Sequence, residues 1–224
     1  MATLIEIVKE YADKADFSIG TYEDDLDYVT EDFCDQVVTA AHKAGLGVDY
    51  QYGATQLCFI DEGNEDYVVK MPFVNKSFCR WEEDDEGQEY EEEVTERYFH
   101  DYTAECADLY DKACKAGVAM FFAKVDSIGS GAWTQEYVIS LGEGGSPRQH
   151  SEAVIKLVTK MSKEHDWKFH PTWIADCLLY YGREAFNKFI DFIKEEKIND
   201  LHGGNYGWTK SGYPRLLDYA GYHE

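Results

Sequence analysis

The residues of this chain that are best suited to chemistry lie in its last quarter. Asp200 is followed five residues later by Asn205, and Asp218 comes thirteen residues after that. Carboxylate and amide oxygens are the ligands that Mg²⁺ prefers, and the ion commonly shares one or two of them with nucleotide phosphates. In such a site the first carboxylate orients or deprotonates a hydroxyl group, while the amide and the second carboxylate hold the metal. The spacing therefore predicts a phosphoryl-transfer site.

Simpler roles for the same residues remain open at this stage. Asp and Asn side chains commonly bond the backbone of turns, so Asp200 and Asn205 could cap backbone amides, and Asp218 could simply end a strand. His202 lies between the first two. It could contact a γ-phosphate or fix the loop through a local hydrogen bond, and the sequence favours neither.

Two features upstream fall in the order that a nucleotide site requires. Gly53 lies at the start of a predicted hairpin, where a small residue lets the backbone approach phosphates. Lys70 comes late in the apolar strand Tyr67–Lys70. A lysine inside such a strand is costly unless it meets an anion, although it could also extend its ammonium group to solvent from an edge strand.

Further residues follow where a nucleotide site would have a carboxylate partner for the lysine and a segment that binds the adenine base. Glu93 and Glu96 lie about 25 residues after the lysine, in a predicted helix, and either could pair with Lys70 or remain on the surface. The segment Trp133–Val138 precedes a Gly-rich break at residues 142–147. Its backbone could bind an adenine ring.

Together these motifs resemble the protein-kinase-like superfamily over roughly residues 50–224. The similarity is closest to small atypical phage kinases and to aminoglycoside- and lipopolysaccharide-type kinases, whose catalytic loop D-L-H-x-G-N matches residues 200–205. The resemblance implies a two-lobed α+β fold and an ATP- and Mg²⁺-dependent phosphotransferase that modifies proteins, with host proteins as the substrates of a phage factor. It implies Lys70 on the α/β-phosphates, Glu93 or Glu96 holding that lysine, Gln135 beside the adenine, the backbone of Glu136 and Val138 on the base, Asp200 as the catalytic carboxylate, and Asn205 and Asp218 as Mg²⁺ ligands.

Several positions depart from the protein-kinase pattern. Ile198 and Asn199 stand where protein kinases have His-Arg, and Tyr219-Ala220 replaces the Phe-Gly after the metal-binding aspartate. The chain has a single Gly at 53 where three are typical, and it ends six residues after Asp218, without an activation segment. We therefore expect a truncated C-terminal lobe, and a kinase fold retained only for binding is the alternative.

The elements that must position these residues follow from hydrophobic periodicity. Helices are predicted at about 3–15, 30–44, 89–116, 150–164 and 171–196. Strands are predicted at 50–60, 66–73, 120–128 and 133–141, with short strands around 207–208 and 215–218. We expect a helical extension (1–48), an acidic N-terminal kinase-like lobe (49–141) and a minimal helical C-terminal lobe that holds the catalytic loop (142–224).

The formal charge of −23 is confined to the first half of the chain. Residues 1–111 hold 30 acidic and 7 basic residues, whereas residues 112–224 hold 14 of each. Phosphate contacts need Lys and Arg, so we expect no direct nucleic-acid binding by the first half. An acidic solvated surface is one interpretation. The other is a non-catalytic interaction protein that mimics nucleic acid and inhibits a basic host nucleic-acid-handling or defence factor, with residues 82–86 in the contact.

Cysteine usage and hydropathy predict a soluble protein of the cytosol, which for a phage factor is the host cytoplasm. The six cysteines form no C-x-x-C pair, and no spacing indicates a zinc site. The longest apolar run, residues 117–123, is far too short to span a bilayer. His165 and His170, with Asp166 between them, have neither a third convergent ligand nor helical spacing, so we expect no metal there.

Overall fold

The structure is a computed structural model that describes residues 2–15, 23–53, 56–64, 66–84, 86–99, 103–129 and 131–219. Its helices and strands are mixed along the chain, and the chain divides into two compact units. Unit 1 comprises residues 1–101 and 127–134, and unit 2 comprises residues 102–126 and 135–224. The α+β class is confirmed, and each unit is described by itself.

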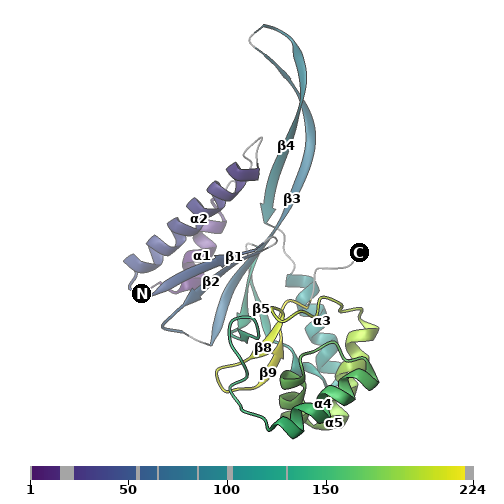
Figure 1. Cartoon of the computed structure of the whole chain (residues 1–224). Helices are drawn as coiled ribbons and strands as arrows, with labels where there is room; N and C mark the ends of the chain where they lie inside the picture. The colour runs from purple at the N-terminus through teal and green to yellow at the C-terminus, as the bar shows by residue number, and fades with distance from the viewer. Residues whose placement is uncertain are drawn as a thin grey trace. The chain divides into compact units, whose positions relative to one another are not determined.

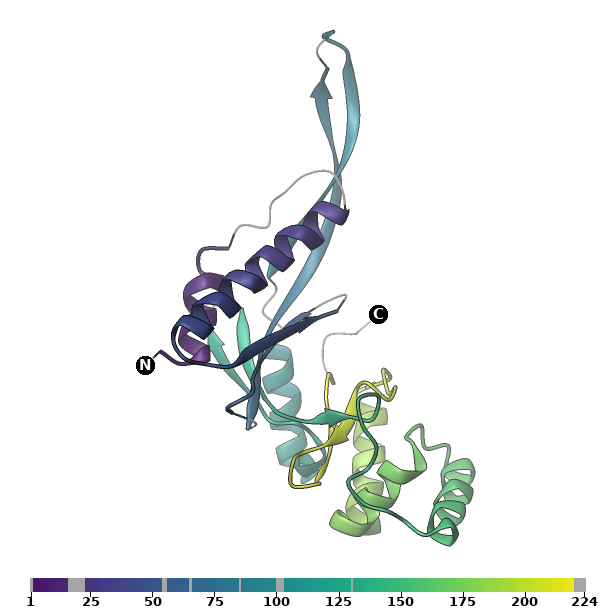
Figure 2. The ribbon, with the colours of Figure 1, turned by 60° about the vertical axis from the view of Figure 1, so that its left-hand side comes forward.

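Unit 1 is an antiparallel sheet with two helices on one face (Figures 1 and 2). The strands are β1 (Val48–Tyr52), β2 (Gln56–Asp61), β3 (Tyr67–Glu83), β4 (Glu89–Phe99), β5 (Val125–Gly129) and β6 (Ala132–Glu136), and residues 127–134 of the last two belong to unit 1. They lie in the order β1-β2-β3-β6-β5, and β4 pairs with β3 off this path. The helices are α1 (Leu4–Ala12) and α2 (Glu23–Lys43). Thr3 begins α1 with a capping box that it shares with Glu6.

The core of unit 1 follows from the two-residue period of β2 and β3. Leu57 and Phe59 of β2 and Val69, Met71 and Phe73 of β3 are buried in one cluster with apolar residues of α1 and α2. Alternate residues of β3 point to the opposite face of the sheet. This alternation fixes the face on which Lys70 lies.

Unit 2 is built from helices around a short three-stranded sheet. The helices are α3 (Thr103–Ala116), the 3₁₀ turn η1 (Ala119–Phe121), α4 (Glu152–His165) and α5 (Pro171–Glu195). The strands β7 (Ile139–Ser140), β8 (Tyr206–Trp208) and β9 (Pro214–Leu216) pair antiparallel in that order. His170 caps α5 and Pro171 occupies its first turn, whereas Gly182, with φ 80°, interrupts the helix.

Stacked aromatic rings form the core of unit 2. Phe121 stacks on Phe189 with ring centroids 4.5 Å apart, and Phe169 stacks on Trp173 at 4.6 Å. Tyr206, the first residue of β8, lies 5.2 Å from the Phe169 ring. Aromatic contacts of this kind stabilise beyond the area that they bury. They fix β8, and with it the end of the loop that precedes it, against α5.

Four sequence expectations about elements need correction. The helix predicted at 89–116 is wrong in its first half, because residues 89–99 form β4 and the helix begins at 103. Glu93 and Glu96 therefore lie in a strand. Tyr90, Val94 and Tyr98 are four residues apart, a spacing that suits a helix and an alternating strand equally, and pairing along β3 decides for the strand. The strands predicted at 50–60 and 133–141 are each two strands, and the one predicted at 120–128 begins in η1.

No helix among the described residues is both long enough and apolar enough to cross a bilayer.

Candidate functional site

The loop between α5 and β8 holds the predicted catalytic carboxylate and amide in direct contact. The side-chain amide nitrogen of Asn205 donates to the Oδ2 atom of Asp200 over 2.9 Å and to the Asp200 backbone carbonyl over 3.0 Å. Asn205 is buried, whereas the Asp200 side chain is 38% exposed. Because the nitrogen of the amide faces Asp200, its Oδ1 atom is turned away from that carboxylate. The pair thus holds one carboxylate toward solvent and orients a separate amide oxygen.

The β8–β9 hairpin brings Asp218 to the same end of the sheet. Tyr206 pairs with Leu216, and the Leu217 N–H donates to the Asn205 carbonyl over 2.7 Å. Asn205 therefore lies opposite Leu217, and Asp218 follows by one residue. The three residues separated by five and thirteen positions in the sequence are neighbours in unit 2.

His202 is oriented by its own loop. Its Nδ1 atom accepts the Gly204 N–H at 3.0 Å, and its Nε2 atom lies 3.6 Å from Oδ1 of Asp200. An Nδ1 atom that accepts leaves the proton of the neutral ring on Nε2, facing the carboxylate. Of the two roles that the sequence left open, this geometry favours the local one.

Two glycines allow the loop and β8 to pack closely. A Cβ atom on Gly204 would lie 2.8 Å from the His202 ring, and one on Gly207 would lie 1.9 Å from the Ile139 carbonyl oxygen. β7 lies against β8 at this point, and the Gly142 N–H donates to the Gly203 carbonyl. The loop of residues 200–205 is therefore tied to the segment that leaves β6.

That segment contains the predicted base-binding residues. Val138 is buried in a small cluster with Ala123 and Leu217, the residue before Asp218. The Glu136 N–H already donates to the Lys124 carbonyl, and the Glu136 side chain accepts from Nε of Arg215 at 2.9 Å. Glu136 can therefore offer a base its carbonyl group but not its N–H. Within unit 2, residues 136–138 and the Asp218 hairpin share contacts.

Gln135 carries a buried acceptor atom. Its side chain is 3% exposed, and its Oε1 atom has no hydrogen-bond partner among the described residues. Leaving a buried acceptor unpaired costs free energy, so such an atom is a natural position for an external donor. An exocyclic amino group, as on adenine, is a donor of this type. The residue that the sequence placed beside the adenine thus has chemistry that suits one.

A buried aspartate behind the loop was not identified from the sequence. Asp176 of α5 is fully buried and accepts from Ser146 Oγ and from Trp208 Nε1, each at 2.8 Å. Its other oxygen lies 3.0 Å from Nε2 of His150. The carboxylate joins α5, β8 and the Gly-rich break. The sequence signal that could have identified it is an acidic residue within the apolar stretch Trp173–Cys177, because a carboxylate is buried only where it has hydrogen-bond partners.

Two tyrosines near the hairpin have perturbed ionisation. Burial raises the pKa of Tyr181 to about 12, and the nearby Arg215 guanidinium partly opposes that rise. Burial also raises the pKa of Tyr219 well above its usual value, and its hydroxyl donates to the Ala123 carbonyl at 2.8 Å. In the predicted resemblance, Tyr219 takes the place of the Phe that follows the metal-binding aspartate of protein kinases. Here its neutral hydroxyl anchors the chain directly after Asp218.

The remaining predicted residues belong to unit 1. Lys70 is 7% exposed in β3, opposite Cys58 of β2, on the sheet face away from α1 and α2. The predicted apolar strand around this lysine is confirmed. Its role toward a phosphate stays a prediction.

Gly53 and the two glutamates gain less support from their positions. Gly53 directly follows β1, and a Cβ atom there would meet nothing within 4 Å, so the backbone does not require glycine. Glu93 lies exposed in β4, opposite Cys79, and Glu96 is paired in register with Lys76. Pairing of either glutamate with Lys70 was expected at a helix start. The β3–β4 register instead places Glu96 and Glu93 six and nine positions along β3 from Lys70, about 20 and 30 Å away at 3.3 Å per residue, so neither side chain reaches the lysine.

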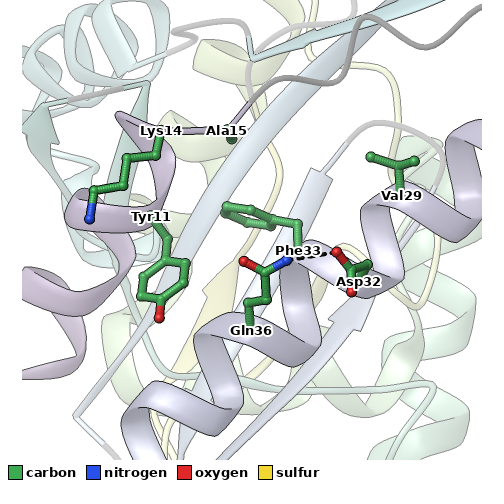
Figure 3. A pocket seen from close by; sticks show the side chains of 7 residues that line it. All are labelled: Tyr11, Lys14, Ala15, Val29, Asp32, Phe33 and Gln36. Atoms are coloured by element: carbon green, nitrogen blue, oxygen red, sulfur yellow. Dashed lines mark hydrogen bonds between the residues drawn. The ribbon is translucent and has the colours of Figure 1, made fainter.

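A cavity of about 190 Å³ lies between α1 and α2 (Figure 3). Its lining includes Tyr11, Phe33 and the hydrogen-bonded pair Asp32 and Gln36, but none of the predicted site residues. No group of three His, Cys, Asp or Glu residues in the described ranges could hold a metal. The donor set of Asp218 and Asn205 is nevertheless adequate for Mg²⁺, which takes its other ligands from water and phosphate.

No protein-family profile, no curated protein and no solved structure was found to match this chain.

Proposed function

We propose that this chain is an ATP- and Mg²⁺-dependent kinase-like phosphotransferase that acts on a protein. The observation that carries the proposal is the cluster at the end of the β8–β9 hairpin, in which Asn205 bonds Asp200 and lies beside the residue preceding Asp218. Asp200 and Asn205 match the kinase-like catalytic loop in type and spacing, and Asp218 matches the separate metal-binding aspartate that follows it. The residue types and their positions together support a phosphoryl-transfer site better than they support the alternative, a turn in which these side chains only cap backbone amides.

Each residue has a definite task in this proposal. The exposed carboxylate of Asp200 accepts the proton of the acceptor hydroxyl and aligns it. Asn205 and Asp218 present oxygens for Mg²⁺, which when bound neutralises phosphate charge. Gln135 offers its Oε1 atom to the base. The resemblance to phage kinases makes host proteins the proposed substrates and the host cytoplasm the proposed location.

Thermal unfolding with ATP and Mg²⁺ tests nucleotide binding. A ligand at ten times its Kd stabilises the folded state by about 1.4 kcal/mol, so the melting temperature should rise by about 3–5 °C. Asp218→Ala should remove this rise. Asp191→Ala, an exposed aspartate of α5, is the matched control and should retain it.

Radiolabel transfer from γ-labelled ATP tests the chemistry separately. Asp200→Asn retains an acceptor oxygen for Asn205 and should keep the nucleotide-dependent rise while losing at least about 100-fold in transfer. Equal incorporation by the wild type, Asp200→Asn and Asp218→Ala would refute the proposal.

A further inference from the structure

A long two-stranded ribbon extends from the sheet of unit 1. β3 pairs with β2 through residues 68–72, and from Phe73 to Glu83 it pairs with β4 in eleven consecutive cross-strand pairs. Both views show this ribbon projecting past the sheet (Figures 1 and 2). Of the described strands, β4 pairs with β3 alone. The distal ribbon thus presents two faces and two edges that the sheet does not use.

The charge of the ribbon is strongly negative. Residues 76–96 hold ten acidic and two basic residues, a net charge of −8. All of this charge lies on a segment that contributes little to the core, because Val94 is its only buried side chain among those described. The fold of unit 1 therefore does not account for the composition of the ribbon.

The two faces differ in how their charge is compensated. Every second cross-strand pair lies on the same face. Three such pairs near the tip define what we call the Trp81 face: Cys79–Glu93, Trp81–Glu91 and Glu83–Glu89. A hydrogen bond to Glu91 raises the pKa of the Cys79 thiol, which agrees with their being diagonal neighbours on this face. Both cations of the distal ribbon occupy the other face, where Arg80 pairs with Glu82 over 2.7 Å.

The Trp81 face is costly to keep exposed. Trp81 is 69% exposed, and Glu83 lies directly opposite Glu89, a like-charge pair that destabilises a hairpin. An indole ring amid carboxylates is, however, a good receptor for a cation, because the ring face and the carboxylates attract the same group. Guanidinium binds both, through stacking and bidentate hydrogen bonds.

We propose that the Trp81 face is a docking surface for a protein partner whose contact region is rich in arginine. Charge complementarity commits the surface to a cationic partner, and Trp81 supplies the aromatic anchor that binding sites of this kind use. The proposal stands apart from phosphoryl transfer, since all of its residues lie in the ribbon. A basic substrate or a basic target of inhibition would both bind here.

Fluorescence anisotropy with a labelled nona-arginine peptide tests the surface. The wild type should bind, and affinity should fall at least about tenfold between 50 and 300 mM NaCl. Trp81→Ala should weaken binding about tenfold, whereas Tyr90→Ala, an exposed aromatic on the other face, should change it less than about twofold.

A charge-matched pair of variants separates a built surface from general polyanion behaviour. Glu83, Glu89, Glu91 and Glu93 are changed to Gln in one variant, and Glu82, Glu86, Glu92 and Glu96 in the other. Both lose four charges, yet only the first should abolish binding. Equal losses in the two variants, or no binding by the wild type, would overturn the proposal. Asp218→Ala should bind the peptide as the wild type does. Loss of the docking proposal can therefore be distinguished from loss of the phosphotransferase proposal.

Discussion

At the scale of single residues, Gly207 shows most directly why a site residue has its identity. A Cβ atom there would lie 1.9 Å from the Ile139 carbonyl oxygen, which is backbone and cannot rotate away. Gly207→Ala should therefore lower the free energy of unfolding by about 2–3 kcal/mol through displacement of β7 from β8. Urea denaturation measures this loss. Gly145→Ala, where nothing lies within 4 Å, is the control, and equal destabilisation by both would contradict this account.

Tyr181 gives a residue-level prediction about pH. Burial raises its pKa to about 12, so the folded state holds this proton more tightly than the unfolded chain does. Between the ordinary pKa of tyrosine, about 10, and about 12, unfolding releases a proton, and stability falls as pH rises. The melting temperature of the wild type should drop steeply above about pH 10. Tyr181→Phe should show a shallower drop, and a parallel curve would contradict the assignment.

At the scale of elements, Arg97 joins β4 to α2 at the base of the ribbon. Its buried guanidinium lies 4.2 Å from the Phe73 ring and donates to Thr30 Oγ1 at 2.6 Å and to Asn75 Oδ1 at 3.0 Å. Arg97→Ala removes this packing and the charged donor to the buried Thr30 hydroxyl, so the free energy of unfolding should fall by about 2–3 kcal/mol. Arg80→Ala, an exposed change in the same ribbon, should cost less than about 0.5 kcal/mol. Chemical denaturation compares the two.

Asp176 has the same linking role among the elements of unit 2. Asp176→Ala would leave the Trp208 indole N–H and the Ser146 hydroxyl without their acceptor. We expect a loss of about 3 kcal/mol in unfolding free energy, compared with nearly none for the exposed Asp191→Ala in the same helix. If Asp176→Ala instead unfolds at the wild-type denaturant concentration, the carboxylate does not hold these elements together.

At the scale of the whole molecule, charge is divided unequally between the two units. Unit 1 carries 27 acidic and 7 basic residues, and unit 2 carries 17 and 14, giving net charges of −20 and −3. Like charges repel in the folded state, and salt screens that repulsion. Raising NaCl from about 20 to about 300 mM should therefore slow hydrogen exchange in unit 1 more than in unit 2. If salt slows hydrogen exchange equally in both units, charge repulsion does not limit the stability of unit 1.

The sequence alone determined most of what depends on local pattern. The helices at residues 4–12, 152–165 and 171–195 follow from apolar spacing, and the apolar strand around Lys70 was predicted correctly. The spacing of Asp200, Asn205 and Asp218 was sufficient to nominate the site, because a loop and a tight hairpin bring residues together over a short stretch of chain. Composition alone located the excess of negative charge.

Only the tertiary structure decided the features that depend on partners distant in sequence. Residues 89–99 became a strand because β3 supplied eleven pairing positions, although their apolar spacing also suited a helix. The carboxylate of Asp176 could be buried because donors from residues 146, 150 and 208 reach it, which no local pattern reveals. The contrast between the two ribbon faces likewise exists only once the register is fixed, since a shift by one residue would move Trp81 to the other face.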